Sequence, residues 1–471
     1  MSWASVGIDQ GTTSTRVLML SETGEVRLAS AGKHRQYYPH SGWVEHDPLE
    51  LLDSIRRCLE LAGPARAVGL ANQGESCLAW DALTGEPLSP VIVWQDSRTA
   101  EAMASLRAQG QEVVTMARAG LPLDPYFSAS KLGWLLQHVP GVGQARREGR
   151  LRLGTTDAFF LDRLTGQFAT DATTASRTSL MNLEQLCWDP TLCALFGVPI
   201  ECLPEIRDTV SDFGAIGSTP VTASIVDQQA SLVGHGCRAA GDVKITFGTG
   251  AFVLAVTEKT IVREPQRGML PTIAWRLAGA TTYAVDGGVY DAGSAVEWAK
   301  SLGLFSDFAQ LACFEAPPAI ERGIAFVPAL SGLACPHWDR SAAATWIGMT
   351  AATTPQDLCQ ALLEGIALRT SEVVRALSVR GSAAPISVDG GLARSDYFVQ
   401  FLAEVLETPI LRPAFHEMSA FGCAVLAAGR FADRLKPPGG EPQIFQPRSA
   451  QGGIWRERFS LAVERSRGWR G

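Results

Sequence analysis

Polar residues interrupt an apolar segment at residues 69–80, which read GLANQGESCLAW. The apolar residues on both sides predict a buried strand, yet the five residues from Asn72 to Ser76 are polar or lack a side chain. Burying polar groups costs free energy unless hydrogen bonds compensate for the lost water. The cluster therefore indicates a binding site, with Asn72 and Gln73 fixing the local backbone.

A turn near the N-terminus offers groups that can bind phosphate. In GIDQGTTSTRVLML, residues 7–20, a strand is followed by Gly11 and a run of hydroxyl residues. Backbone N–H groups and hydroxyls of such a hairpin can hold phosphate oxygens, and a carboxylate at the strand end can organise a hydrated Mg²⁺. The predicted nucleotide ligands are Thr12, Thr13, Ser14 and Arg16, and Asp9 is predicted to contact the metal through water. A hairpin of this kind can also be purely structural.

Two glycine-rich turns in the second half resemble this hairpin in composition. ITFGTGAFVLAV, residues 245–256, repeats the strand–turn–strand pattern, and VDGGLARSD, residues 388–396, lies between a short strand and a helix. Glycines let a backbone approach a phosphate or an adenine closely. Two such hairpins on opposite sides of a cleft would hold a triphosphate from both sides. The nucleotide ligands predicted in these turns are Thr249, Gly250, Gly390, Gly391 and Ser395, and Gly293, which lies outside both turns, is predicted with them.

A carboxylate follows an apolar strand in SIVDQQASLVGHG, residues 224–236. An aspartate at the carboxyl end of a strand, near the junction of two domains, is well placed to act as a general base. Asp227 is therefore the predicted base, and contact with a metal ion is an additional role. An alternative role for Asp227 is the N-cap of the helix that follows, and this role is compatible with both the base and the metal contact. Taken together, the motifs predict phosphoryl transfer from a nucleotide to a small hydroxyl compound.

Strand-like and helix-like segments alternate along the chain, which predicts an α/β fold. The repeated strand–turn–strand pattern predicts two similar domains, residues 1–236 and 237–471, with a cleft between them. The expected strands are 5–8, 16–21, 67–71, 90–94, 243–247, 252–257, 282–285, 324–328 and 386–388, and the expected helices are 49–61, 130–138, 354–377 and one that starts near 397.

Bulk composition excludes several classes of protein. A chain of 471 residues is long enough for two domains, and its net charge of −7 argues against nucleic acid or an anionic membrane as the main partner. We expect no secretory signal and no membrane span, because no apolar stretch approaches about 20 residues. The ten cysteines show no C-x-x-C spacing, which favours a reduced, cytoplasmic protein without a zinc site.

The order of these motifs resembles the FGGY family of carbohydrate kinases. YFSASKLGWLLQH at 126–138 is similar to the first signature of that family, and AAATWIGMTAATTPQDLCQALLE at 342–364 is similar to the second. The resemblance implies two ribonuclease-H-like, actin-like ATPase domains with an active-site cleft between them. Within the family, YPHSGWVEHDP at 38–48, TDATTASRT at 170–178 and VDQQASL at 226–232 are most similar to the enzymes that phosphorylate glycerol.

This resemblance also implies roles for particular residues. Asp227 would take the proton from the attacking hydroxyl of a small polyol or sugar, with ATP and Mg²⁺ as the cofactors. The residues that would hold the polyol are Glu75, Trp94, Tyr126, Asp227, Gln228 and Phe252. We further expect a homo-oligomer, most simply a dimer.

Three departures from the family pattern affect the expected substrate and regulation. Position 74 is glycine where enzymes of this branch usually carry an arginine, which predicts a void that admits a longer substrate. Asp291 is at a position where an apolar residue is usual, and it could form a hydrogen bond with the additional hydroxyl of a longer substrate. The segment before Asp227 lacks the Gly-Gly-Lys-Gly-Gly-Thr-Arg stretch, so inhibition by a sugar bisphosphate is not expected. The alternatives are a kinase for a four- or five-carbon polyol or ketose, and a non-catalytic actin-like ATPase that serves a protein partner.

Overall fold

The computed structural model describes residues 3–264, 267–377, 384–433 and 435–470. The chain forms two compact units, each assembled from separate stretches of sequence. The first unit comprises Met1–Gly236, Pro271–Tyr283 and Glu417–Pro438. The second comprises Cys237–Leu270, Ala284–His416 and Gly439–Gly471. Two short segments from the second half of the sequence therefore belong to the first unit.

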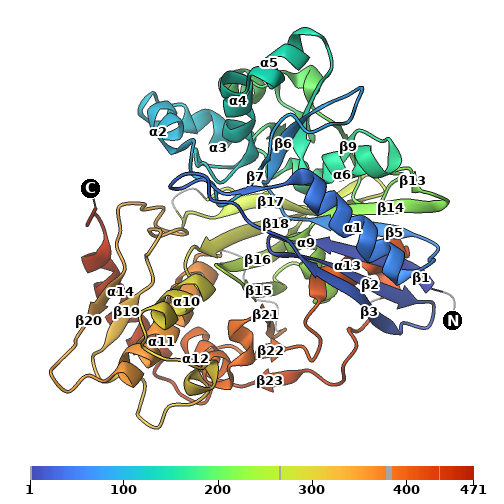
Figure 1. Ribbon diagram of the computed structural model, residues 1–471. Helices are drawn as coiled ribbons and strands as arrows, with labels where there is room; N and C mark the ends of the chain where they lie inside the picture. Colours follow the sequence, from blue (N-terminus) through green and yellow to red (C-terminus); the bar gives the residue numbers. More distant parts are fainter. Residues whose placement is uncertain (1–2, 265–266, 378–383, 434, 471) are drawn as a thin grey trace. The chain divides into compact units, whose positions relative to one another are not determined.

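A six-stranded sheet with the order β13-β14-β5-β1-β2-β3 organises the first unit (Figure 1). β1 pairs antiparallel with β2 and parallel with β5, and β5 pairs parallel with β14. The antiparallel pair is the predicted N-terminal hairpin. The strands are β1 (Trp3–Gln10), β2 (Ser14–Ser21), β3 (Val26–Lys33), β5 (Val68–Asn72), β13 (Ala215–Ile216) and β14 (Thr219–Val226).

Alternate residues of β1 face different helices, as expected for a strand covered on both sides. Val6 and Ile8 lie in one hydrophobic core with Leu51 and Ile55 of α1 (Pro48–Ala62). Gly7 points the other way, where a Cβ atom would lie 2.1 Å from a backbone oxygen of α13 (Met418–Ala427). α13 also packs against α9 (Asp227–Gly234), so this late helix is an integral part of the first unit.

A second, four-stranded sheet of the first unit has the order β4-β7-β6-β8. β6 carries the chain away from the polar cluster that follows β5. The strands are β4 (Glu45–His46), β6 (Cys77–Asp81), β7 (Val91–Ile92) and β8 (Leu151–Thr155). The remaining main elements are α2 (Ala100–Ala108), α3 (Glu112–Arg118), α4 (Ser128–His138), α5 (Pro140–Arg147), α6 (Thr156–Thr165), β9 (Ala169–Asp171), α7 (Ala172–Ala175), α8 (Pro190–Phe196) and β12 (Glu205–Arg207).

The main sheet of the second half repeats the strand pattern of the first. Its order is β17-β18-β16-β15-β21-β22-β23. β15 pairs antiparallel with β16 and parallel with β21, as β1 does with β2 and β5. The internal repeat predicted from the two hairpins is therefore confirmed. The strands are β15 (Val243–Phe247), β16 (Ala251–Glu258), β17 (Leu270–Leu277), β18 (Ala280–Val289), β21 (Ile386–Gly390), β22 (Ile410–Arg412) and β23 (Gln443–Phe445).

Helix α11 shows how local sequence sets the ends of an element in the second unit. Its N-cap Thr354 and Asp357 exchange hydrogen bonds in a capping box, and Pro355 occupies the first helical position. These signals start a helix at this point. The helices of this unit are α10 (Gly293–Ser301), α11 (Pro355–Ala376), α12 (Asp396–Leu406) and α14 (Gly452–Ser466), with the strand pair β19 (Ala325–Val327) and β20 (Thr345–Ile347).

Some predicted boundaries are wrong. The strand expected at 282–285 extends through Gly287 to Val289, because the glycine marks close packing rather than the strand end: a Cβ atom there would lie 2.7 Å from Val373 Cγ1. The strand expected at 90–94 is only Val91–Ile92. Across the described part of the chain, no helix combines the length and apolar character that crossing a membrane requires.

Candidate active site

Three parallel strands of the first unit end at the same edge of the sheet. Gln10 of β1 and Val226 of β14 are both in register with Asn72 of β5. The phosphate-type hairpin, the polar cluster and Asp227 follow these three strand ends directly. Ligands of open α/β sheets bind outside the carboxyl ends of the strands. The register thus brings the three motifs predicted in the first unit to one edge.

The polar cluster is buried and held by its own hydrogen bonds. Asn72, Gln73, Glu75 and Ser76 are at most 5% exposed. Asn72 Nδ2 donates to the backbone oxygen of Gln73 at 3.2 Å, and Ser76 Oγ donates to Gln73 Oε1 at 3.2 Å. Ser76 Oγ also accepts from the backbone N–H of Trp94 at 3.1 Å. The expectation of a side chain that fixes the local backbone is confirmed for Asn72, whereas the Gln73 amide bonds the side chain of Ser76.

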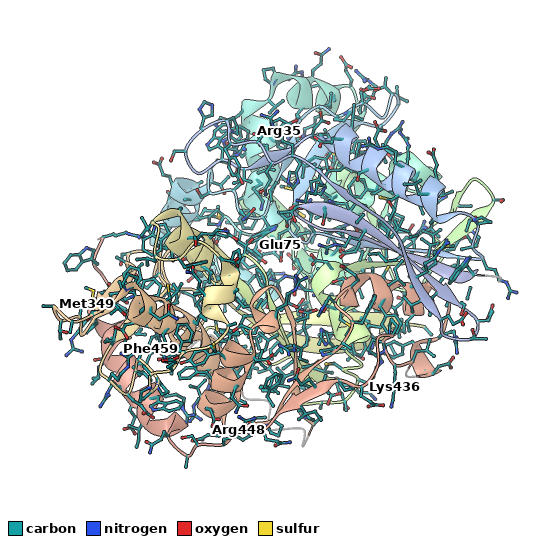
Figure 2. The ribbon with its side chains drawn as sticks, turned by 60° about the horizontal axis from the view of Figure 1, so that its bottom comes forward. Arg35, Glu75, Met349, Lys436, Arg448 and Phe459 are labelled. Carbon is teal, nitrogen blue, oxygen red and sulfur yellow. The ribbon has the colours of Figure 1, made fainter. Side chains whose placement is uncertain are left out.

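Glu75, which is labelled in Figure 2, adopts a strained backbone conformation. Its φ of 59° lies in the left-handed region, which costs a non-glycine residue about 1–3 kcal/mol. Its carboxylate accepts a hydrogen bond from Arg177 Nε at 2.6 Å, and its backbone oxygen accepts one from Ser128 Oγ at 3.0 Å. Strain of this kind persists where the surroundings over-determine a conformation, which is common at functional sites.

Gly74 lies close to Val226. A Cβ atom added to Gly74 would lie 3.2 Å from Val226 Cγ1. This distance is shorter than nine in ten of the contacts that Cβ atoms make in proteins. Val226 is 2% exposed and precedes Asp227. A side chain at position 74 would therefore press on Val226, which must shift by a few tenths of an ångström. The void expected beyond this contact stays a prediction.

The aromatic residues of the first unit lie close to the hairpin and to Glu75. The ring centroids of Trp94 and Tyr126 are 5.7 Å apart. Trp94 Nε1 donates to Thr12 Oγ1 at 3.0 Å, which ties the predicted polyol residues to the predicted phosphate hairpin. The guanidinium of Arg177 lies 5.9 Å from the Tyr126 centroid while it binds Glu75. Trp94, Tyr126 and Glu75 thus form one contiguous group.

The hairpin itself is closed by a hydrogen bond from the backbone N–H of Gly11 to the oxygen of Ser14 at 3.0 Å. Thr13 is exposed at its tip. Arg16 follows in β2, and its Nη1 lies 3.1 Å from Glu417 Oε2 and 4.0 Å from Asp9 Oδ2. The guanidinium therefore lies next to two carboxylates, one of them contributed by the start of α13.

The donor set around Asp9 suits a metal held mostly by other ligands. The described residues include no group of three or more His, Cys, Asp or Glu side chains that could hold a metal ion. Asp9 offers a carboxylate near the strand end and is 8% exposed. Mg²⁺ usually keeps several waters and binds through one or two carboxylates plus substrate phosphates. The residues present therefore fit Mg²⁺ in the water-mediated way that the sequence predicts.

Asp227 is the first residue of α9, and the N-cap is Val226. The expectation that Asp227 itself is the N-cap is therefore wrong. Its Oδ1 accepts from the backbone N–H of Gln228 at 2.6 Å, and its backbone oxygen accepts from Ser419 Oγ at 3.1 Å. A carboxylate in the first turn is stabilised by the helix dipole. Asp227 and Gln228 are both half-buried, so their side chains remain accessible to a ligand.

The second unit contains a cavity of about 760 Å³ beside its own hairpin. This volume is within the usual range for small-molecule sites. Thr249, Gly293, Gly391 and Ser395 line the cavity, so four of the six nucleotide ligands predicted in this half come together. The other lining residues are Phe247, Gly248, Ser294, Val296, Glu297, Phe308, Ala309, Leu311, Ala312, Leu363, Leu392 and Arg394.

Close backbone contacts build the wall of this cavity. The φ of Gly390 is +94°, and a Cβ atom there would lie 2.2 Å from the backbone oxygen of Phe247. A Cβ atom on Gly293 would lie 2.5 Å from the backbone oxygen of Gly248, to which Gly293 donates an N–H bond of 3.0 Å. A Cβ atom on Gly250 would lie 2.6 Å from the oxygen of Val289. These glycines are required for packing in addition to any role in binding.

The two remaining residues singled out from the sequence also belong to the second unit. Phe252 is half-buried in β16, apart in the chain from the other predicted polyol residues. Asp291 is 3% exposed, and burial raises the pKa of its carboxyl. That carboxyl accepts hydrogen bonds from the N–H and Oγ of Ser331 at 2.7 and 3.0 Å and from Ser294 Oγ at 3.2 Å. These contacts give Asp291 a structural role that the sequence did not predict.

Several residues of the site were missed by sequence reasoning. Arg177 lies within a motif that was recognised, TDATTASRT, but nothing in the motif indicates that it binds Glu75. Arg394 lies in the glycine-rich turn at 388–396 and was passed over for its neighbours. Phe308, Leu311 and Ala312 line the cavity from a segment with no periodic pattern, so no sequence signal could have identified them.

Comparison with known proteins agrees with this arrangement. The model of the N-terminal domain of the FGGY family of carbohydrate kinases matches residues 4–237, and the C-terminal domain model matches residues 243–430. A protein of Rhodospirillum centenum named glycerol kinase is 41% identical over 449 residues, covering 91% of this chain and 90% of that relative. A glycerol kinase of Alkalilimnicola ehrlichii is 40% identical over 492 residues and covers 99% of both chains.

A solved structure shows the same fold. The crystal structure of Plasmodium falciparum glycerol kinase with ADP matches with a TM-score of 0.87 at 29% identity, over 98% of this chain and 98% of that one. The chain therefore has the two-domain α/β fold expected from its sequence, with sheets that match those of actin-like ATPase domains. With both family models matched along most of its length, this chain belongs to the FGGY family of carbohydrate kinases.

Proposed function

We propose that the chain transfers a phosphoryl group from ATP to a hydroxyl of glycerol or a closely related short polyol or ketose. The observation that carries this proposal is the shared register of Gln10, Asn72 and Val226, which brings a phosphate hairpin, a hydroxyl-binding cluster and a carboxylate to one sheet edge. The choice of glycerol rests on relatives of about 40% identity that bear the name glycerol kinase over nearly the full length of the chain.

Asp227 acts as the general base in this proposal. It accepts the proton of the substrate hydroxyl as that oxygen attacks the γ-phosphorus and the bond to the leaving ADP oxygen breaks. Its half-buried position at the start of α9 supports the assignment, because the carboxylate is both accessible and held by the backbone. General-base groups contribute about 10²–10⁴-fold to rate.

Glu75 and Gln228 bind hydroxyls of the polyol, and Trp94 and Tyr126 contact its C–H groups. Small-molecule sites combine apolar walls with a few placed polar groups in this way. Phe252 of the second unit completes the predicted set. The contact group of Trp94, Tyr126 and Glu75 described above supports these roles.

The two hairpins and the glycine turns bind the nucleotide. Thr12, Thr13, Ser14 and Arg16 contact phosphate oxygens from the first unit. The cavity of the second unit takes the rest of ATP, with Gly250 and Gly390 supporting the lining residues named above. Asp9 would hold Mg²⁺ through water and Asp227 would be a second contact, and the ion would supply positive charge against the phosphates. We accordingly propose that residues 1–236 contain the polyol site, the first phosphate hairpin and the catalytic Asp227, and that residues 237–471 bind the nucleotide and end in the final helix.

The decisive experiment is a coupled ADP-release assay with Mg-ATP and a panel of acceptors. The panel contains glycerol, dihydroxyacetone, erythritol, erythrulose, ribitol and xylulose. We expect the highest kcat/KM with glycerol or dihydroxyacetone, and Asp227→Asn should lower kcat at least about 100-fold without loss of ATP binding. A preference for xylulose or ribitol would refute the substrate assignment, and an Asp227→Asn variant with a tenth of the native kcat would refute the base.

Assembly and location belong to the same proposal. We expect a cytoplasmic homodimer, which light scattering of the purified protein and cell fractionation test directly. A monomer at assay concentration, or recovery in the membrane fraction, would contradict this part without affecting the chemistry.

A further inference from the structure

The segment 170–178, which reads TDATTASRT, is unusually polar for a buried stretch of chain. Seven of its nine residues are polar or charged, and each of the seven is at most 3% exposed. Buried polar groups are retained when they are hydrogen-bonded, and such networks rigidify the parts they join. The segment forms the end of β9, the short helix α7 and the turn after it.

One end of the segment contacts the residue before the predicted base. Asp171 caps α7 by accepting from the backbone N–H groups of Thr173 and Thr174, both at 2.9 Å. The hydroxyl of Thr173 donates to Asp171 Oδ1 at 2.8 Å, and its oxygen accepts from the backbone N–H of Val226 at 3.0 Å. Since Val226 is joined to Asp227, this chain of hydrogen bonds fixes the backbone from which the base extends.

The other end of the segment contacts the hydroxyl-binding residue. Arg177 Nε donates to Glu75 Oε1 at 2.6 Å, with both side chains no more than 6% exposed. Phe127 and Tyr126 flank the guanidinium, whose Cζ lies 5.6 and 5.9 Å from their ring centroids. A buried carboxylate held on one oxygen by a fixed guanidinium has a defined orientation.

The middle of the segment contacts the strand between these two ends. Thr174 Oγ1 donates to Asn72 Oδ1 at 3.2 Å, at the strand end that precedes the polar cluster. Ser176 Oγ donates to the backbone oxygen of Thr173 at 2.7 Å and so ties α7 to the turn that carries Arg177. A single nine-residue segment therefore forms hydrogen bonds with Asn72, with Glu75 and with Val226, the residue before Asp227.

We infer that segment 170–178 is the positioning element of the acceptor site: Thr173 places the base through Val226, and Arg177 orients Glu75 toward the polyol. This inference rests on the proposed function. Neither residue touches the reacting atoms, so each acts through another group. The two contacts predict separable defects, because Glu75 binds substrate while Asp227 takes part in the chemical step.

The test compares kinetic constants for glycerol and for Mg-ATP in matched variants. Arg177→Ala should raise the KM for glycerol by about 10- to 150-fold, the scale of a hydrogen bond to a charged group, and leave the KM for ATP within twofold. Sub-denaturing guanidinium chloride should lower that KM again, whereas sodium chloride at equal ionic strength should not. Arg177→Lys should lie between Arg177→Ala and the native enzyme.

Thr173 is tested in the same assay. Thr173→Val keeps the shape but removes the hydroxyl, so kcat should fall about tenfold while the KM for glycerol stays within twofold. Thr173→Ser restores the hydroxyl and should restore kcat. Arg152→Ala is the control, because Arg152 forms another ion pair of the first unit, with Asp162. It should change neither constant more than twofold.

The outcomes separate this inference from the proposed function. If Asp227→Asn and Glu75→Gln are impaired but Thr173→Val and Arg177→Ala match the control, the positioning role is refuted and the function stands. If Asp227→Asn retains its activity, the function itself is refuted. Equal losses for glycerol and ATP in Arg177→Ala, with no guanidinium rescue, would show a merely structural residue. Should Arg177→Ala not fold, Arg177→Lys and Thr173→Ser decide the question.

Discussion

Gly293→Ala is expected to damage nucleotide binding through the backbone of the second hairpin. Gly293 begins α10, and a Cβ atom there would lie 2.5 Å from the backbone oxygen of Gly248. Real Cβ contacts are essentially never shorter than 3.0 Å, so the helix start and the hairpin must separate by at least about 0.5 Å. The obstacle is a backbone atom, which cannot rotate away as a flexible side chain would.

The size of the effect follows from the cost of overpacking. Extra methyl groups in a packed site cost about 1–3 kcal/mol. If the hairpin moves to relieve the clash, most of that cost falls on ATP binding, since Gly248, Thr249 and Gly293 all line the cavity. The KM for ATP should then rise about 5- to 150-fold, with the KM for glycerol nearly unchanged.

The assay is initial-rate kinetics at saturating glycerol with varied Mg-ATP, supported by calorimetric titration of ADP. Gly453→Ala is the matched control, because Gly453 lies at the start of α14 and its Cβ atom would meet only Arg456 Nη2, at an ordinary 3.6 Å. A Gly293→Ala enzyme whose KM for ATP stays within twofold of that control would show that the hairpin does not shape the nucleotide site.

Three further predictions follow from other parts of the molecule. Burial raises the pKa of Glu364 from 4.5 to about 7, so the folded chain binds more protons than the unfolded chain between these values. Stability contributed by this group is full below pH 4.5 and falls by about 3 kcal/mol as the pH rises to 7; urea unfolding of native and Glu364→Gln proteins at pH 5 and 8 should show this fall in the native protein only. Gly74→Arg should lower kcat/KM for glycerol about 5- to 150-fold by pressing on Val226, and Val226→Ala should recover part of the loss; an improved Gly74→Arg enzyme would instead support the predicted void. Asp9→Asn should weaken the apparent affinity for Mg²⁺ about 10- to 100-fold in activity titrations, and an unchanged Mg²⁺ dependence would remove Asp9 from the metal site.

Local patterns in the sequence were sufficient to predict the hairpins and the elements beside them. β15 has the predicted bounds, Val243–Phe247, and the helix expected at 354–377 is α11, Pro355–Ala376. The strand ends that carry Asp9, Asn72 and Asp227 could also be located, because each follows a short apolar run. Chemistry placed at strand ends is accessible to sequence reasoning, since both the strand and the polar residues after it are local features.

Long-range packing could not be predicted in the same way. α13 is buried on nearly all sides, so it lacks the amphipathic period that identifies a surface helix. Its place in the first unit depends on contacts such as Ser5 Oγ to the oxygen of Ala424, which join residues 419 positions apart. Likewise Arg177 and Glu75 are 102 positions apart, and the contact between Gly74 and Val226 depends on the register of two strands. None of these pairings has a signal in either segment alone.

At two positions of the repeated hairpin, neither packing nor backbone conformation requires the glycine that is present. Gly11 and Gly248 hold equivalent places in their hairpins, and neither has a φ in the left-handed region. A Cβ atom would meet nothing closer than 3.5 Å at Gly11 and 3.9 Å at Gly248, in contrast to the blocked positions Gly250 and Gly293.

A side chain at either hairpin glycine would therefore fill open space in front of the backbone. A phosphate group that approaches the backbone there would need that space. We expect Gly11→Ala and Gly248→Ala to keep the native melting temperature within about 2 °C, since fixing a glycine backbone is neutral or mildly stabilising where the conformation permits. Each should nonetheless raise the KM for ATP several-fold. Variants that bind ATP normally would show that phosphate does not approach these turns, whereas variants that lose stability would show that the glycines serve the fold after all.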